Sequence, residues 1–304
     1  MKLIAICGAT ATGKTALAVE CAKRLDGEVV SCDALLVYRG LNIGTAKPTA
    51  EEMGGIVHHL IDVADPRQSF SVHDFEMLAI PVVEDILARG KVPVLCGGTG
   101  FYMNAILFRS GFGHVAADAS VRAKYEAIVR EKGNEALHSM LAERDPESAE
   151  KLHPNDVRRV IRALEIYELT GKKKSDQADT QTPRFPYEAF AFDYPREELY
   201  ERIARRTQSM LDAGLVREVE GLLAAGIPED AQCMQGIGYK EVVECLKNND
   251  LQSTMYDIIL KNTRNYAKRQ LTFFKKLPGL HWLAPTDCQT AAKEIELILS
   301  LIHI

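Results

Sequence analysis

Gly8-Ala9-Thr10-Ala11-Thr12-Gly13-Lys14-Thr15 matches the pattern G-x-x-x-x-G-K-[ST] of a phosphate-binding loop, or P-loop. An apolar run at residues 3–7 precedes it and an amphipathic helical pattern at 15–25 follows it, which is the context that the motif requires. Backbone amides and the N-terminus of the helix favour a phosphate there. We expect the whole loop to bind it, with Lys14 supplying positive charge and Thr15 holding Mg²⁺. The alternative interpretation, a glycine-rich turn without a ligand, gives no reason for a lysine at position 14.

Outward from this loop, strands and helices alternate through residue 108 or so. Predicted strands cover 3–7, 28–31, 92–96 and 187–192, and predicted helices cover 15–25, 72–88 and the segment that Gly171 ends. This alternation predicts an α/β fold whose core is a P-loop NTPase-like parallel sheet, covered by helices on both faces.

From residue 111 the pattern changes. Gly111-Phe112-Gly113 breaks the alternation, and helices follow with little strand signal. Residues 172–186 are polar and contain proline, which predicts a loop. We expect a core domain of residues 1–110 and 190–304, a helical insertion domain at 111–189, and a helical C-terminal part.

Composition sets limits on function. The net charge of -5 over 304 residues does not mark a nucleic-acid binder, although a basic face can hide inside such a total. No apolar run approaches the roughly 18 residues of a membrane span. The seven cysteines are scattered and form no C-x-x-C pair. Cys7, Cys32 and Cys96 are typical of buried apolar positions, so we expect a reduced, cytoplasmic, zinc-free protein.

An acidic residue follows the second predicted strand, in Ser31-Cys32-Asp33. Ligand sites gather at the carboxyl ends of parallel strands, so Asp33 is expected near the P-loop. There it could take a proton from an attacking nucleophile, or only cap a turn. The P-loop leaves the reaction open, because it can hold ATP for phosphoryl transfer, as in a small-molecule kinase, or another diphosphate as leaving group.

A basic stretch lies near the C-terminus. Residues 258–286 contain no Asp or Glu. Its cations and aromatics are Lys261, Arg264, Lys268, Arg269, Lys275, Lys276, Tyr266, Phe273 and Phe274. Such a face can meet RNA phosphates and stack on bases, or be a solvated face over a core. His58 and His59 point to opposite faces of a strand, so we interpret them as structural and not as metal ligands.

Long segments of the sequence resemble the tRNA dimethylallyltransferase family. They are SCDALLVYRGLNIGTAKPTAEE at 31–52, HHLID at 58–62, GGTGFY at 97–102, RRVIRALEIYELTG at 158–171, QGIGYKE at 235–241 and TRNYAKRQLTFF at 263–274. Together they cover nearly the whole chain. The bacterial form, without a C-terminal zinc finger, is implied.

The resemblance implies transfer of a dimethylallyl group from dimethylallyl diphosphate to N6 of adenosine-37 in tRNAs with A36-A37-A38, leaving diphosphate. It implies Mg²⁺ as cofactor and the catalytic residues Asp33, Lys14, Thr15 and, from RIARRTQSML at 202–211, Arg206. The tRNA-binding positions that it implies are Asp33, Ala34, Leu35, Leu36, Thr99, Arg122, Val157, Arg158, Arg159, Val160 and Ile161. We also expect the protein to be a monomer in the cytoplasm, with no membrane contact.

Three positions depart from the family pattern. Ala34, Leu36 and Arg158 stand where the family usually has Ser, Gln and Gln. All three fall in stretches that the family uses to contact tRNA, so we predict a shifted acceptor preference. Two alternatives stay open: an adenylate isopentenyltransferase that acts on free AMP, and a catalytically silent tRNA-binding paralogue.

Overall fold

The computed structural model describes residues 2–109, 118–176, 182–248 and 252–302. It divides into two compact units, Met1–Leu107 with Pro183–Ile304, and Phe108–Thr182. The expected second boundary at residue 190 lies inside a core strand that begins at Tyr187, so the chain returns to the first unit earlier than the sequence suggested. The predicted break at residues 111–113 lies outside the described residues.

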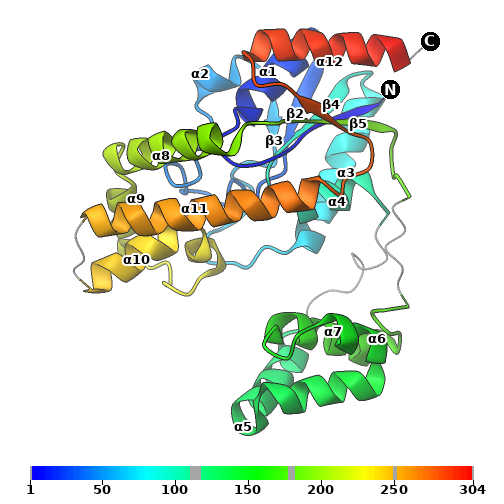
Figure 1. Ribbon diagram of the computed structural model, residues 1–304, viewed down its shortest axis with the longest axis vertical. Helices are drawn as coiled ribbons and strands as arrows, with labels where there is room; N and C mark the ends of the chain where they lie inside the picture. Colours follow the sequence, from blue (N-terminus) through cyan, green and yellow to red (C-terminus); the bar gives the residue numbers. More distant parts are fainter. Residues whose placement is uncertain (1, 110–117, 177–181, 249–251, 303–304) are drawn as a thin grey trace. The chain divides into compact units, whose positions relative to one another are not determined.

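The first unit is built on one six-stranded sheet (Figure 1). The strands are β1 (Leu3–Ile6), β2 (Gly27–Ser31), β3 (His58–His59), β4 (Val92–Cys96), β5 (Tyr187–Phe192) and β6 (Leu280–Leu283), in the order β3-β2-β4-β1-β5-β6. Every pairing is parallel. The predicted parallel sheet is therefore confirmed, and its two central strands, β4 and β1, are continuous apolar runs because both faces are covered.

The prediction of a helical C-terminal part was wrong at β6. This strand is only four residues long and pairs β5 at the edge of the sheet. Its sequence LHWL is too short to show a clear alternating pattern, so no period marks it.

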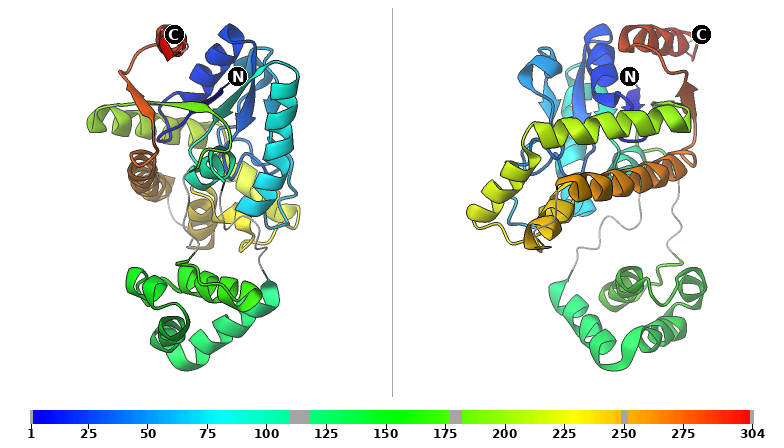
Figure 2. Two further views of the ribbon diagram at one scale, coloured as in Figure 1. Left: turned by 90° about the vertical axis from the view of Figure 1, so that its right-hand side faces the viewer. Right: turned by 60° about the vertical axis from the view of Figure 1, so that its left-hand side comes forward.

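Helices cover both faces of the sheet (Figure 2). On one face α1 (Lys14–Arg24) packs beside α12 (Cys288–Ile302), and their buried side chains share a core with β1, β2 and β4. On the other face α3 (Val72–Ala88) packs on α4 (Gly100–Leu107). The short α2 is Ala50–Met53. The two layers bury the sheet, as the alternating pattern predicted.

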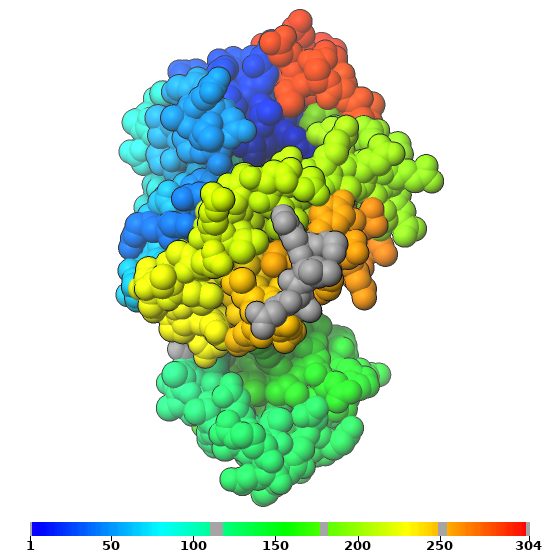
Figure 3. Space-filling model, turned by 90° about the vertical axis from the view of Figure 1, so that its left-hand side faces the viewer, coloured from blue at the N-terminus to red at the C-terminus, as the bar shows by residue number. Residues whose placement is uncertain are grey.

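Four helices and one 3-10 turn complete the first unit: α8 (Arg196–Asp212), α9 (Leu215–Ala224), η1 (Gln232–Gln235), α10 (Tyr239–Asn248) and α11 (Gln252–Phe274). Helices α8 and α11 lie side by side, in yellow-green and orange in Figure 3. Hydrogen bonds tie them to loops at the carboxyl ends of the strands, where ligand sites form in such sheets.

The second unit is helical, with α5 (Ala119–Arg144), α6 (Pro146–Lys151) and α7 (Val157–Thr170). It has a core of its own, around Tyr125, Leu137 and Leu164. Gly171 ends α7 with a left-handed φ of 68°, as the sequence predicted. No helix or strand covers the described part of the predicted loop at 172–186. Among all described residues, no helix is both long and apolar enough to cross a bilayer.

Candidate active site

The P-loop joins β1 to α1. Gly13 stands at the N-terminus of α1 with φ +87°, a conformation that side-chain-bearing residues rarely adopt. Lys14 Nζ donates to the Ala9 carbonyl at 2.5 Å, and Thr12 Oγ1 donates to the same oxygen at 2.9 Å. The lysine thus lies folded over its own loop, at the place where a phosphate would take its hydrogen bonds.

Two side chains from distant helices hold this loop. Gln270 of α11 is 5% exposed; its Oε1 accepts from Thr10 N at 2.9 Å, and its Nε2 donates to the Gly98 carbonyl at 2.9 Å. A Cβ on Gly98 would lie 2.1 Å from Nε2, which explains the glycine. Arg202 Nε of α8 donates to the Ala11 carbonyl at 2.8 Å. Sequence reasoning missed both residues, because nothing in a helical pattern marks such a long-range bond.

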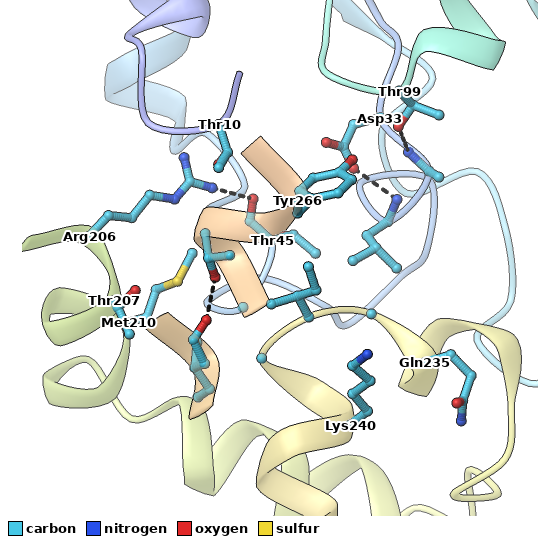
Figure 4. Close-up of a pocket in the computed structure, with 18 of the residues that line it drawn as sticks. Thr10, Asp33, Thr45, Thr99, Arg206, Thr207, Met210, Gln235, Lys240 and Tyr266 are labelled. Atoms are coloured by element: carbon cyan, nitrogen blue, oxygen red, sulfur yellow. Dashed lines mark hydrogen bonds between the residues drawn. The ribbon is translucent and has the colours of Figure 1, made fainter. Parts of the chain in front are cut away.

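Two cavities open beside the loop. The larger, about 380 Å³, is bounded by the Asp33 turn, α8, α11 and the loop before α10. The smaller, about 90 Å³, is bounded by the P-loop, β2 and the loop after Thr45. Five residues line both: Thr10, Asp33, Thr45, Arg206 and Tyr266. Figure 4 shows these five side by side, so the cavities meet at one junction.

Asp33 is at that junction and also caps a turn. Its Oδ1 accepts from the backbone amides of Leu35 at 2.9 Å and Leu36 at 3.3 Å. Thr99 Oγ1 accepts from Ala34 N at 3.0 Å, which fixes the same turn from the GGTGFY segment. Within the described residues, the hydrogen bonds of Asp33 engage Oδ1 alone, so both expected roles are compatible: one oxygen caps and the other faces the junction.

The turn at Asp33 divides three predicted tRNA-binding residues, at positions 34–36, between the two cavities. Ala34 and Leu35 line the larger cavity, whereas Leu36 lines the smaller one together with Pro48 and Ile61. Leu36 therefore lies on the P-loop side of the turn, and its predicted role in tRNA binding stays a prediction. The bonds to Asp33 curl the backbone there, so residue 36 faces the P-loop side.

Positive charge gathers at the junction. Lys14 and Arg206 contact backbone carbonyls, and within the described residues neither has a carboxylate at ion-pair distance. Burial lowers the pKa of Lys14 to about 8, a shift that Arg206 increases and Asp33 opposes. Burial also lowers the pKa of Arg206 and, with the Asp33 charge second, raises the pKa of Tyr266 to about 12. Half-buried cations without counter-ions favour an anionic ligand.

One carboxylate fixes the loop that carries Thr45. Glu218 of α9 accepts from three successive amides and one phenol: Asn42 N at 3.0 Å, Ile43 N at 2.7 Å, Gly44 N at 3.1 Å and Tyr239 Oη at 2.7 Å. The Thr45 carbonyl then accepts from Arg206 Nη2 at 3.3 Å. The position of the arginine thus depends on a glutamate that the sequence did not single out.

The histidine pair has two different environments. His59 Nε2 lies 2.8 Å from Glu28 Oε2, as a structural residue would. His58 instead lines the smaller cavity, with Nδ1 at 2.9 Å from the Ile56 carbonyl, and burial lowers its pKa. Lining a cavity does not exclude a structural role, so the interpretation of His58 as structural stays a prediction. No cluster of three or more His, Cys, Asp or Glu able to hold a metal occurs among the described residues.

The second unit carries the other predicted tRNA positions. Arg158 and Arg159 are exposed on α7 and Val157 is half-buried, whereas Val160 and Ile161 are buried in the core of the unit. The helical period turns these last two side chains inward, and the tRNA contact predicted for this stretch stays a prediction.

Arg122 is tied to a buried carboxylate in the same unit. Its Nε and Nη2 lie 2.8 Å and 3.1 Å from the two oxygens of Glu165, which is fully buried. Glu165 also accepts from Asp118 N at 2.8 Å and Arg162 Nη1 at 2.6 Å. Arg122 is 43% exposed, so the pair fixes its stem and leaves part of the guanidinium open to solvent.

The basic stretch forms most of α11. Lys261 and Lys268 are exposed, and the Arg264 guanidinium lies 4.9 Å from the centre of the Tyr200 ring on α8. Tyr266 lines both cavities, and Phe274 is fully buried. The cations thus remain available to a polyanion, while Phe274 serves the core and not base stacking.

Comparison with known proteins agrees with this geometry. Residues 36–277 match the sequence profile of IPP transferase. A tRNA dimethylallyltransferase of Halalkalibacterium halodurans is 47% identical over 300 residues, 97% of this chain and 95% of its own length. A tRNA isopentenylpyrophosphate transferase structure from Bacillus halodurans is 44% identical, with a TM-score of 0.73 and coverage of 98% and 95% of the two chains. A eukaryotic dimethylallyltransferase acting on tRNA has 29% identity and a TM-score of 0.84, over 99% of this chain and 79% of its own. The chain therefore belongs to the IPP transferase family.

Proposed function

We propose that this protein transfers the dimethylallyl group of dimethylallyl diphosphate to N6 of adenosine-37 in tRNAs with A36-A37-A38, releasing diphosphate. The observation that carries the proposal is the junction of the two cavities at Asp33 and Arg206. A phosphate-binding cavity and a larger one that meet at a carboxylate suit a reaction between an anionic donor and a neutral nucleophile. Relatives with the same named activity cover almost the whole chain.

The smaller cavity suits the diphosphate of the donor. The loop amides and Lys14 bind its oxygens, and Arg206 reaches it from the other side of the junction. Negative charge grows on the diphosphate as the C1–O bond breaks, so these cations stabilise the transition state more than the ground state. Their partial burial strengthens the effect, because fewer waters screen the charges.

The residues of the smaller cavity also suit magnesium. Mg²⁺ prefers oxygen ligands, keeps several waters, and binds proteins through one or two side chains plus substrate phosphates. The hydroxyl of Thr15 and the carboxylate of Asp33 line this cavity, so the donor set fits. Bound there, Mg²⁺ would neutralise charge on the leaving diphosphate, with Thr15 as the protein ligand.

The larger cavity suits the acceptor base. Its volume of about 380 Å³ falls in the range of small-ligand sites, which is enough for one adenine taken out of its stack. N6 attacks C1, the N6–C1 bond forms as the C1–O bond breaks, and Asp33 accepts the proton that N6 loses. Exposed cations of α11, and Arg158 and Arg159 of the second unit, are proposed to bind the tRNA backbone.

The test uses labelled dimethylallyl diphosphate, Mg²⁺ and unmodified tRNA, with AMP and a kinase assay on ATP as parallel reactions. We expect label on tRNA alone. Asp33→Asn keeps an oxygen that can cap the turn but removes the base, so it should lose transfer while still binding tRNA. Asp193→Asn, an exposed aspartate away from both cavities, is the matched control. Label on AMP alone, phosphoryl transfer, or tRNA binding without transfer would each overturn the proposal. We further propose a cytoplasmic monomer.

A further inference from the structure

Two buried polar atoms in the smaller cavity have no hydrogen-bond partner among the described residues: Ser31 Oγ and His58 Nε2. Ser31 is only 3% exposed. Buried polar groups are nearly always satisfied, so two orphans in one cavity indicate that a ligand or its water completes them. Both residues line this cavity together with Lys14 and Thr15.

The strand register puts both side chains on one face of the sheet. Val29 of β2 pairs with His58 of β3, and side chains two residues apart on a strand share a face, which adds Ser31. Ser31 in turn pairs with Cys96 of β4, which lines the same cavity. A single wall of the smaller cavity, distinct from the P-loop, therefore presents the two orphan atoms.

The two atoms differ in what they can bind. The Ile56 carbonyl only accepts, so His58 Nδ1 at 2.9 Å must carry the hydrogen. In the neutral ring Nε2 is then an acceptor, and it cannot donate to a phosphate oxygen. The Ser31 hydroxyl can donate to one directly.

We propose that Ser31 and His58 form the second wall of the diphosphate site, with Ser31 Oγ donating to a diphosphate oxygen and His58 Nε2 accepting from a water bound to Mg²⁺. The inference rests on the proposed function, since it takes the smaller cavity to be the diphosphate site. In this arrangement the P-loop binds the diphosphate, and the second wall binds both the diphosphate and a water of the magnesium ion.

The test is calorimetric titration of inorganic diphosphate into the full chain, once with Mg²⁺ and once with EDTA. Ser31→Ala should raise Kd about 2- to 12-fold in both, the fold-change of one lost hydrogen bond. His58→Asn places an amide where Nδ1 was, keeps the bond to Ile56 and lacks Nε2, so it should raise Kd by a similar factor with Mg²⁺ and leave it unchanged in EDTA. His58→Gln places its amide where Nε2 was and should restore most of the affinity.

His59→Asn is the matched control, because this neighbour points to the other face and bonds Glu28. Its Kd should equal that of the unmodified protein, and thermal unfolding of each variant checks that it is folded. Variants of Ser31 and His58 that bind like the unmodified protein would overturn the inference and leave the proposed function standing. Failure of the unmodified protein to bind diphosphate in either condition would overturn the donor site of the proposed function, and the inference with it.

Discussion

Replacing Gln270 by leucine should disconnect the P-loop from α11. The two side chains are similar in size, so the change removes the amide while leaving little new space. It leaves two main-chain groups without partners, Thr10 N–H and the Gly98 carbonyl, both now bonded at 2.9 Å. An unsatisfied buried group costs about 1–3 kcal/mol, so the sum is about 2–6 kcal/mol. Thr10 lines both cavities and water can reach it, which favours the lower half of this range.

Urea unfolding measures this loss, and diphosphate titration measures its effect on the loop. We expect the free energy of unfolding to fall by about 2–3 kcal/mol and the Kd for diphosphate to rise, because the loop no longer has a fixed conformation before binding. Gln208→Leu is the control: this glutamine is exposed on α8 and bonds Asp212 of the same helix, so its loss should cost under about 0.5 kcal/mol. If Gln270→Leu unfolds like the control, the reasoning about the buried amide is refuted.

Three further predictions concern charge and the acceptor side. Burial lowers the pKa of Lys14 to about 8, so the free site loses this positive charge above that pH. Above pH 8 the Kd for diphosphate should therefore rise about tenfold per pH unit relative to that of Lys14→Arg, whose charge does not change there. If the Kd values of the two proteins change with pH in the same way, the prediction is contradicted. Glu165→Gln should cost about 2 kcal/mol in urea unfolding, less than a fully buried pair, because Arg122 is 43% exposed; an unchanged midpoint would contradict it. Ala34→Ser adds a hydroxyl facing the larger cavity and should raise kcat/KM for a standard acceptor tRNA about 2- to 12-fold, whereas no gain in either constant would reject a shifted acceptor preference.

The sequence was sufficient to predict what local patterns encode. The strand–loop–helix context of Lys14, the parallel sheet and the end of α7 at Gly171 follow from periodicity and from the special backbone of glycine. The cap at Asp33 was predicted and is confirmed, whereas the role of this carboxylate as a base stays a prediction.

What the sequence did not predict depends on contacts between distant segments. Gln270 bonds a loop 260 residues away, and Glu218 bonds amides more than 170 residues away. His58 was assigned by strand alternation alone, which shows that neighbours differ but not which of them faces a cavity. Val160 and Ile161 came among the tRNA-binding positions through the family motif, which carries no burial information.

The order of the elements along the chain places the residues of the two cavities outside the helical insertion. β1 lies between β4 and β5, so the strand before the P-loop pairs with chain from both sides of the insertion. Arg202 and Gln270, which fix the P-loop, and Arg206 at the junction also come after it. The second unit has its own core, and none of its described residues lines either cavity. Substitutions on its surface, such as arginine at position 158, can therefore alter which RNA is held without moving Asp33 or Lys14. Ala34 is different, because its amide is bonded to Thr99 beside Asp33, the proposed base. On the proposed function, we expect a change there to act on the acceptor base itself.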